Sequence, residues 1–174
     1  MTEPQFKKFT WFDVPKSIWY FLGPDKSQWS FFNVILFVVF FYDLVPPLIV
    51  GGMIDFFTEY QFGDSLRTFY AYAIFLGVAH TVISLIRLTS KGKLSRIGIK
   101  TRARARIQGF ESLINLPLHW HAHENTGNKI ERVFTGSQAL REWSYFTGNS
   151  LFPITVAFIG VLGAFIFLSP VFFV

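Results

Sequence analysis

Residues 87–143 read RLTSKGKLSRIGIKTRARARIQGFESLINLPLHWHAHENTGNKIERVFTGSQALREW and form the one long polar segment between apolar blocks. No proline lies between Pro47 and Pro117. An apolar run that ends near Leu88 can therefore continue as one helix past the bilayer, because the first residue able to interrupt it is Pro117. The chain is expected to leave the membrane in this helix, to turn, and to come back in a second helix.

The returning helix is predicted to begin near Asn128. Asn128 and Glu131 have the spacing of a capping box, in which two side chains satisfy free amides in the first turn of a helix. Apolar residues then recur on one face of the predicted helix, with charged residues away from it. We therefore interpret residues 89–143 as a helical hairpin outside the bilayer. The apolar positions are Ile130, Val133, Phe134 and Leu140.

The composition indicates an integral membrane protein. Of 174 residues, 51% are hydrophobic and 20% aromatic, and the mean hydropathy is +0.38. Such a chain is too apolar for an ordinary soluble domain and long enough for only a few spans. It contains no cysteine, which excludes a disulfide framework and a thiolate metal site.

The distribution of charge predicts the topology. The formal net charge is +5, and eight Lys and Arg residues lie between Arg87 and Arg106 with no acidic residue among them. Basic segments beside spans stay on the cytoplasmic side of a membrane. We therefore predict a multi-pass protein of the plasma (inner) membrane, with the hairpin 89–143 and the N-terminus in the cytoplasm.

Residues 1–28 are predicted to be a cytoplasmic N-terminal segment with an interfacial elbow helix. Asp13 is a plausible N-cap, Gly23 is placed to end the helix, and Pro24 prevents its continuation. The many aromatic residues between these points favour the headgroup region of a bilayer. The alternative is an aromatic-rich soluble tail that packs on its own domain.

Three spans are predicted in the rest of the chain, at about residues 31–54, 69–88 and 145–168, and a fourth is expected to start at Val171. Arg87, at the end of the second span, is expected to extend to the cytoplasmic interface. The sequence ends four residues into the fourth apolar stretch. We therefore expect this chain to be a fragment of a longer product.

The first span carries candidate residues for a substrate path or a gate. Asp43 lies near its middle and is followed by Pro46 and Pro47, whose missing amides leave helical carbonyls without partners. A carboxylate at this position is costly against lipid, so this face should look into a bundle interior or a wet cavity. The alternative is an aspartate paired with a neighbouring helix. The candidates are Asp43, Pro46, Pro47 and, at the outer end, Asp55.

No catalytic, cofactor or metal site is predicted. His119, His121 and His123 invite a metal hypothesis, but Glu124 is the only carboxylate near them and no cysteine completes the set. We therefore interpret them as surface or partner-contact histidines. The chain has no phosphate-binding loop, and no nucleic-acid-binding module accompanies the basic hairpin, so a nucleic-acid partner is not expected.

The order of these segments resembles the transmembrane domain of type I ABC exporters. The resemblance rests on a kinked span ending PPLIVGGMIDFF, a span running into RIGIKTRARARIQGFESLINLPLHW, the turn HENTGNKIERV and a third span. It extends from the interfacial helix to the start of the fourth of the six spans of that fold. It implies an all-α fold: a polytopic transmembrane helical bundle with long cytoplasmic helical extensions, of which residues 29–174 are the N-terminal part.

In that family the turn between the second and third spans carries a coupling helix that docks on a nucleotide-binding domain. By resemblance, residues 118–126 occupy this position, with Trp120 as the aromatic anchor where the family usually has Phe or Tyr. An aromatic residue at the apex of a rigid hairpin is well placed to be an interface hot spot. The implied partner-binding residues are Leu118, His119, Trp120, His121, Ala122, His123, Glu124, Asn125 and Thr126.

The function implied is that of the transmembrane part of an ATP-driven exporter, which forms the substrate path and couples it to a nucleotide-binding domain. That domain is absent from this chain and would act in cis or in trans, with its own ATP and Mg. The chain alone is therefore not expected to be an enzyme. Other expected partners are the lipid bilayer, a second half-transporter in a homo- or heterodimer, and an unknown exported substrate. The alternative is a short membrane scaffold that uses its basic hairpin.

Overall fold

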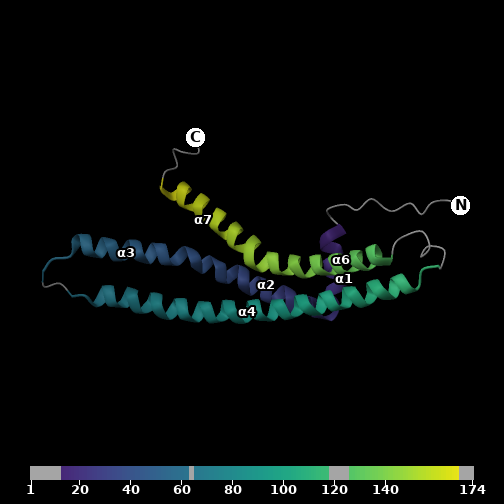
Figure 1. The fold of residues 1–174 in the computed structure, drawn as a ribbon. Helices are drawn as coiled ribbons and strands as arrows, with labels where there is room; N and C mark the ends of the chain where they lie inside the picture. The colour runs from purple at the N-terminus through teal and green to yellow at the C-terminus, as the bar shows by residue number, and fades with distance from the viewer. Residues whose placement is uncertain (1–12, 63–64, 118–125, 169–174) are drawn as a thin grey trace. The chain divides into compact units, whose positions relative to one another are not determined.

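The computed structural model describes residues 13–62, 65–117 and 126–168. These residues form helices, and no strand occurs among them, which confirms the all-α prediction (Figure 1). The chain divides into two compact units. The hairpin unit holds Met1–Ser30 and Arg96–Trp143, and the span unit holds Phe31–Ser95 and Ser144–Val174.

The first predicted span is a broken helix. It consists of α2 (Lys26–Phe41), a short 3₁₀ turn η2 (Tyr42–Leu44) and α3 (Val45–Glu59). Prolines occupy the first positions of α3, where a missing amide is tolerated, and the tighter turn before them takes up the break. The predicted interruption at Pro46 and Pro47 is confirmed, and the helix runs five residues beyond the predicted end at Ile54.

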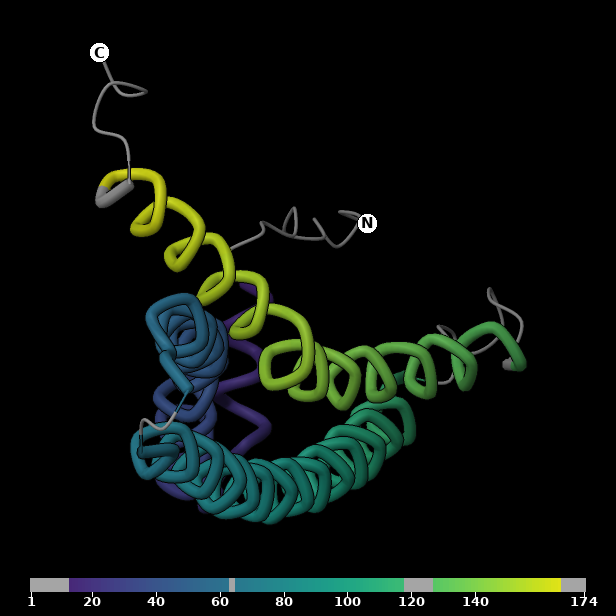
Figure 2. The backbone as a smooth tube through the Cα atoms, turned by 90° about the vertical axis from the view of Figure 1, so that its left-hand side faces the viewer, coloured from purple at the N-terminus to yellow at the C-terminus, as the bar shows by residue number. Residues whose placement is uncertain are grey.

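A single helix, α4 (Arg67–Ile114), follows without a break over 48 residues. At about 1.5 Å per residue it is about 72 Å long, more than twice the hydrocarbon thickness of a bilayer. Its first part lies beside α3 (Figures 1 and 2). The rings of Phe57 and Phe69 are 5.0 Å apart there. The prediction that the second span continues into the polar segment as one helix is confirmed.

The returning part of the chain contains α6 (Thr126–Phe146), a π-helical turn η3 (Thr147–Leu151) and α7 (Phe152–Leu168). The predicted helix start near Asn128 is confirmed to within two residues, since α6 begins at Thr126. Asn128 lies in the first turn of α6 and not at its N-cap, so the predicted capping box is wrong. The π-turn was not predicted. Pro153 follows it after one residue, Phe152, and since proline cannot donate to the carbonyl four residues earlier, the wider turn accommodates the missing hydrogen bond.

Inside the span unit, α2, α4 and η3 meet at a small contact point. A Cβ atom on Gly148 would lie 3.2 Å from Leu36 Cδ1 and 3.6 Å from Leu94 Cδ1, and both leucines are buried. Most other apolar side chains of the spans are exposed in the isolated chain. Among the described residues, three helical stretches are long and apolar enough to cross a membrane: Asp13–Glu59, Arg67–Ile114 and Gly127–Ile166.

The hairpin unit contains α1 (Asp13–Leu22) and a 3₁₀ turn η1 (Gly23–Asp25), in addition to parts of α4 and α6. The helix ends where predicted, since Gly23 adopts a φ of +53°, a left-handed conformation that glycine adopts without strain. Ile18 and Leu22 are buried, whereas Trp19 and Tyr20 are exposed. The helix is therefore amphipathic, with its apolar face packed inside the unit.

Candidate functional site

An ion pair of the span unit joins the break in the first span to α4. Arg87 Nη2 donates to Asp43 Oδ1 at 2.6 Å. The guanidinium carbon of Arg87 also lies 4.8 Å from the centre of the Phe40 ring, on the turn before the break. The carboxylate of Asp43 thus holds the charged end of Arg87, and the predicted extension of Arg87 to the cytoplasmic interface stays a prediction.

This ion pair fits the alternative interpretation of Asp43, an aspartate paired with a neighbouring helix. The Arg87 and Asp43 side chains are 28% and 48% exposed in the isolated chain, so the pair is reachable from one side. It also places Asp43 beside the end of the predicted second span that leads into the polar segment, and not at the middle of that span. A role in gating stays a prediction.

A second cation approaches the same aromatic ring from outside the predicted span. Lys91 Nζ lies 5.6 Å from the centre of the Phe40 ring. Partial burial lowers the pKa of Lys91 below its usual value, the Arg87 charge acts in the same direction, and Asp43 opposes both. Two cations thus share one ring and one carboxylate, which leaves the cluster with a surplus of positive charge.

The other predicted path residues lie along α3. Pro46 is half-buried and Pro47 is exposed, directly after the break that contains Asp43. Asp55 lies farther along the helix, where Thr58 Oγ1 donates to its backbone carbonyl at 2.7 Å. Twelve residues of helix correspond to about 18 Å. The structure therefore brings Asp43, Pro46 and Pro47 together but not Asp55.

An apolar groove of about 700 Å³ runs beside the break in the span unit. Tyr42 and Val45 form one wall, and α4 forms the other. The hydroxyl of Tyr42 is buried and has no hydrogen-bond partner among the described residues. Its ring lies 6.3 Å from that of His80. The α4 wall consists of Ala71, Ile74, Phe75, Val78, Ala79, Val82 and Ile83.

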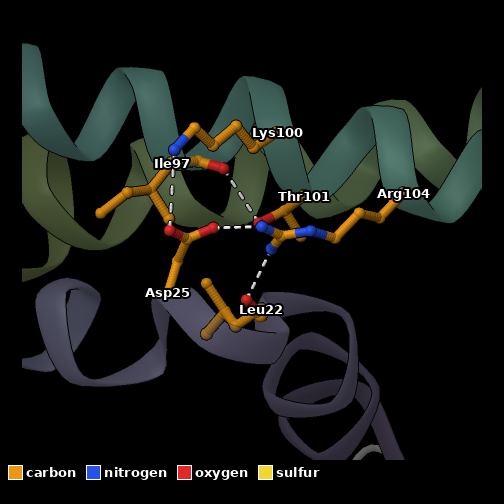
Figure 3. Close-up of polar contacts among 6 residues, drawn as sticks. All are labelled: Leu22, Asp25, Ile97, Lys100, Thr101 and Arg104. Carbon is orange, nitrogen blue, oxygen red and sulfur yellow. Dashed lines mark hydrogen bonds and ion pairs between the residues drawn. The ribbon is translucent and has the colours of Figure 1, made fainter.

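A separate cluster in the hairpin unit holds the end of α1 on α4 (Figure 3). Asp25 is only 8% exposed and accepts a hydrogen bond from Arg104 Nη2. Arg104 Nη1 donates to the Leu22 carbonyl at 2.7 Å, and Lys100 Nζ lies 3.7 Å from Asp25 Oδ1. Sequence reasoning missed this cluster. Its signal was the i,i+4 spacing of Lys100 and Arg104 together with an aspartate directly after a Gly-Pro turn.

Two other arginines hold α4 to α6 in the same unit. Arg102 Nη1 donates to Gln138 Oε1 at 3.0 Å, and Arg106 Nε donates to Ser137 Oγ at 2.9 Å. The two helices approach closely one turn later, where a Cβ on Gly109 would lie 2.8 Å from Val133 Cγ1. The hairpin is therefore fastened by polar contacts as well as by close packing.

The family comparison agrees with this arrangement. The family model of the ABC transporter transmembrane region matches residues 29–174. The chain belongs to this family. No curated protein and no solved structure matches it. This ABC transporter chain is a membrane protein and supplies the part of a transporter that crosses the bilayer, a region that is not itself catalytic.

ABC transmembrane regions work with nucleotide-binding domains and within the lipid bilayer. The segment predicted to dock on such a domain, residues 118–126, lies outside the described residues except for Thr126, the first residue of α6. Its anchor Trp120 and the histidines at 119, 121 and 123 therefore stay predictions. Within the described ranges, no group of three or more His, Cys, Asp or Glu side chains is placed to hold a metal ion.

Proposed function

We propose that this chain is the N-terminal part of a half-transporter of an ATP-driven exporter, and that it forms part of the substrate path and couples that path to a nucleotide-binding domain. The observation that carries the proposal is the unbroken course of α4 over 48 residues. One end of this helix packs beside the broken first span, and the other leads to the apex of the hairpin. Movement at the apex is therefore delivered to the membrane by one stiff element.

The break in the first span is the proposed place where the path changes shape. Prolines at the start of α3 leave the turn Tyr42–Leu44 without regular helical hydrogen bonds, so bending there is less costly than in an intact helix. Asp43 and Arg87 hold this turn on α4. We infer that the apolar groove beside Tyr42 belongs to the path and that Asp43, Pro46 and Pro47 control its shape, with Asp55 at the outer end.

The predicted segment 118–126 is the part of the chain that contacts a nucleotide-binding domain, and Trp120 inserts into that domain. That domain binds ATP and Mg and is attached in cis or in trans. A second half-transporter, identical or related, completes the path. The orientation that supports this scheme places the N-terminus and the hairpin in the cytoplasm and the spans in the plasma membrane, since the basic residues gather in the hairpin.

Alternating access can be measured without knowing the exported substrate. Because this chain has no cysteine, Ile74→Cys adds one reporter to it on an exposed wall of the groove, and any cysteine in the rest of the transporter is replaced by Ser. In the full transporter in sealed vesicles, we expect trapping with Mg-ATP and vanadate to change the rate at which an impermeant maleimide labels Cys at this position. Trp120→Ala should abolish this change while ATP hydrolysis continues.

Trp120→Phe is the matched control, because an aromatic side chain is retained at the apex. It should keep the nucleotide-dependent change in labelling. If labelling of the Ile74→Cys protein never responds to nucleotide, the exporter proposal is wrong and a scaffold function is favoured. If the response survives Trp120→Ala, the assignment of the hairpin apex is wrong.

A further inference from the structure

We propose that Asp25 is a positioning residue that fastens the elbow segment to the hairpin, so that α1, the cytoplasmic part of α4 and α6 move as one body. The elbow segment is defined here as residues 13–25. This inference rests on the proposed function, because it specifies what travels with the hairpin when nucleotide binds. It concerns contacts inside the hairpin unit alone.

Three side chains on one stripe of α4 contact the elbow segment. Lys100, Arg104 and Gln108 follow one another at i,i+4 spacing and therefore share a face of the helix. Lys100 and Arg104 reach Asp25, and Gln108 Nε2 donates to Tyr20 Oη at 3.0 Å. The elbow is thus held at two successive points along α4.

Asp25 is the centre of this stripe because it is nearly inaccessible to solvent. Its carboxylate is 11% exposed and faces two cations, while Arg104 also donates to the last carbonyl of α1 at Leu22. Figure 3 shows the Arg104 guanidinium between the two acceptors. One guanidinium therefore satisfies both the end of the helix and the carboxylate of the following turn, and removing either charge leaves buried polar atoms without partners.

A second stripe of side chains on α4 contacts α6 in the same unit. Arg102 and Arg106, again at i,i+4 spacing, bind Gln138 and Ser137 of α6. The stripes alternate along the helix, so α4 holds the elbow and α6 independently. Loss of the Asp25 contact should therefore release α1 while the pairing of α4 with α6 survives.

The exposed face of the elbow indicates what this attachment does. Trp19 and Tyr20 are 48% and 62% exposed, and Lys26 Nζ lies 5.7 Å from the Trp19 ring. Exposed aromatic and basic groups on an amphipathic helix suit the headgroup region of a bilayer. An elbow that is fixed to the hairpin therefore sets the depth of the hairpin below the membrane surface and moves with it.

Spin-label distances test the attachment directly. The full transporter is placed in lipid nanodiscs with spin labels on only one of its halves. Lys16→Cys and Glu131→Cys place these labels on exposed positions of α1 and α6. We expect one narrow distance distribution that is unchanged by trapping with Mg-ATP and vanadate. Asp25→Asn and Arg104→Gln should each split or broaden it and make it respond to nucleotide.

Controls separate positioning from general damage. Arg96→Gln removes an exposed arginine two turns earlier on α4 and should leave the distribution unchanged. Labels at Ser112→Cys and Glu131→Cys report the pairing of α4 with α6, which should persist in Asp25→Asn. Asp25→Glu keeps a carboxylate beside Arg104 and should keep the narrow distribution, whereas Lys100→Gln removes only the exposed cation, should change the distribution little, and serves if a neutral variant at position 25 or 104 fails to fold.

The proposal is overturned if Asp25→Asn and Arg104→Gln both leave the Lys16–Glu131 label distance as it is in the unmodified chain. It is also overturned if that distance changes with nucleotide while Asp25 and Arg104 are intact. The comparison of the label distance between the variants and the unmodified chain requires no ATP. It therefore tests the role of Asp25 even if the proposed exporter function is wrong. The exporter function is tested separately by the maleimide labelling, in which Trp120→Ala should abolish the nucleotide-dependent change.

Discussion

The guanidinium of Arg87 lies 2.6 Å from the carboxylate of Asp43, across the break that interrupts the first span. The two residues are 44 positions apart, so the contact fixes the register of the first span on α4. It also joins the 3₁₀ turn of the first span to α4. Any change in the bend at Tyr42–Leu44 must either carry Arg87 with it or break this pair.

Removing Arg87 should destabilise the membrane-inserted chain more than removing Asp43. In Arg87→Leu the short aspartate side chain loses its hydrogen-bonded partner and keeps only the more distant charge of Lys91. A lone charge costs about 2.5–3.5 kcal/mol at the bilayer centre and less toward the interface, so we expect a cost of about 1–3 kcal/mol. In Asp43→Asn the long arginine can reach the cytoplasmic interface, so the expected cost is about 1 kcal/mol or less. The measurement is the free energy of unfolding in lipid bicelles.

The double variant Asp43→Asn with Arg87→Leu is the control for this asymmetry. It should be more stable than Arg87→Leu alone, because no unpaired carboxylate remains. Equal costs for the two single variants would show that Asp43 has another partner in the assembled membrane protein.

Close packing of α7 on the break predicts a difference between two glycines of one helix. A Cβ on Gly160 would lie 2.3 Å from Leu44 Cδ2, whereas nothing lies within 4 Å of a Cβ on Gly163. Gly160→Ala should therefore cost about 1–3 kcal/mol by overpacking. Gly163→Ala should be neutral or stabilising by up to about 1 kcal/mol. Unfolding free energies in bicelles distinguish the two.

Truncation of the opposing side chain checks the cause. Leu44→Ala removes the atoms that the new methyl group would meet, so it should lower the cost of Gly160→Ala in a double-mutant cycle. An unchanged cost in that background would locate the strain elsewhere.

The helices of this chain were predictable because their signals are local. Long apolar runs predicted the spans, the prolines at 46 and 47 predicted the break, and Gly23 predicted the end of the elbow helix. Each of these features acts within a turn or two of the residue that causes it. The π-turn before Pro153 shows the limit, since a proline near a helix start is also compatible with a regular first turn.

The polar pairs were not predictable, because they depend on how distant helices align. Asp43 meets a residue 44 positions away, and Asp25 meets one 79 positions away. Sequence reasoning identified Asp43 as a costly charge in a span but could not choose its partner, and it gave Asp25 no role. The partners of the two basic stripes on α4 can be assigned only when the helices that face each stripe are known.

The close approach inside the hairpin predicts a larger effect at Gly109 than at another glycine of α4. A Cβ on Gly109 would meet Val133 Cγ1 at 2.8 Å and Cγ2 at 3.2 Å. Valine is stiff at χ1 and cannot turn both methyl groups away, so Gly109→Ala should force α4 and α6 apart at a cost of about 1–3 kcal/mol. The measurement is the rate of proteolysis of the hairpin in the membrane-inserted protein.

Gly92→Ala is the matched substitution, because nothing lies within 4 Å of a Cβ at that position. Alanine favours the helix over glycine by about 0.5–1 kcal/mol, so this variant should slow proteolysis or leave it unchanged. Faster proteolysis of Gly92→Ala than of Gly109→Ala would mean that the two helices do not pack as described.

The two cations beside Asp25 should contribute very unequally to stability. Arg104→Ala leaves a carboxylate that is 11% exposed without its hydrogen-bonded partner and also removes the donor to the Leu22 carbonyl. Removing one partner of a fully buried pair costs about 3–5 kcal/mol, and since Arg104 is 34% exposed and Lys100 remains, we expect about 2–3 kcal/mol here. Lys100 is 62% exposed and its Nζ lies 3.7 Å from the carboxylate, so Lys100→Ala should cost about 1 kcal/mol or less.

Chemical denaturation in mixed micelles measures this difference, followed by the fluorescence of Trp19 after the other four of the chain's five tryptophans have been replaced by Phe. Trp19 lies on α1 and should report the release of the elbow in Arg104→Ala at a denaturant concentration where Lys100→Ala is still folded. Added salt should weaken the Lys100 contribution and leave that of Arg104 nearly intact, because screening acts mainly on exposed charges. Equal losses for the two variants would mean that Asp25 is solvated, and that the elbow is held by the burial of Ile18 and Leu22 instead.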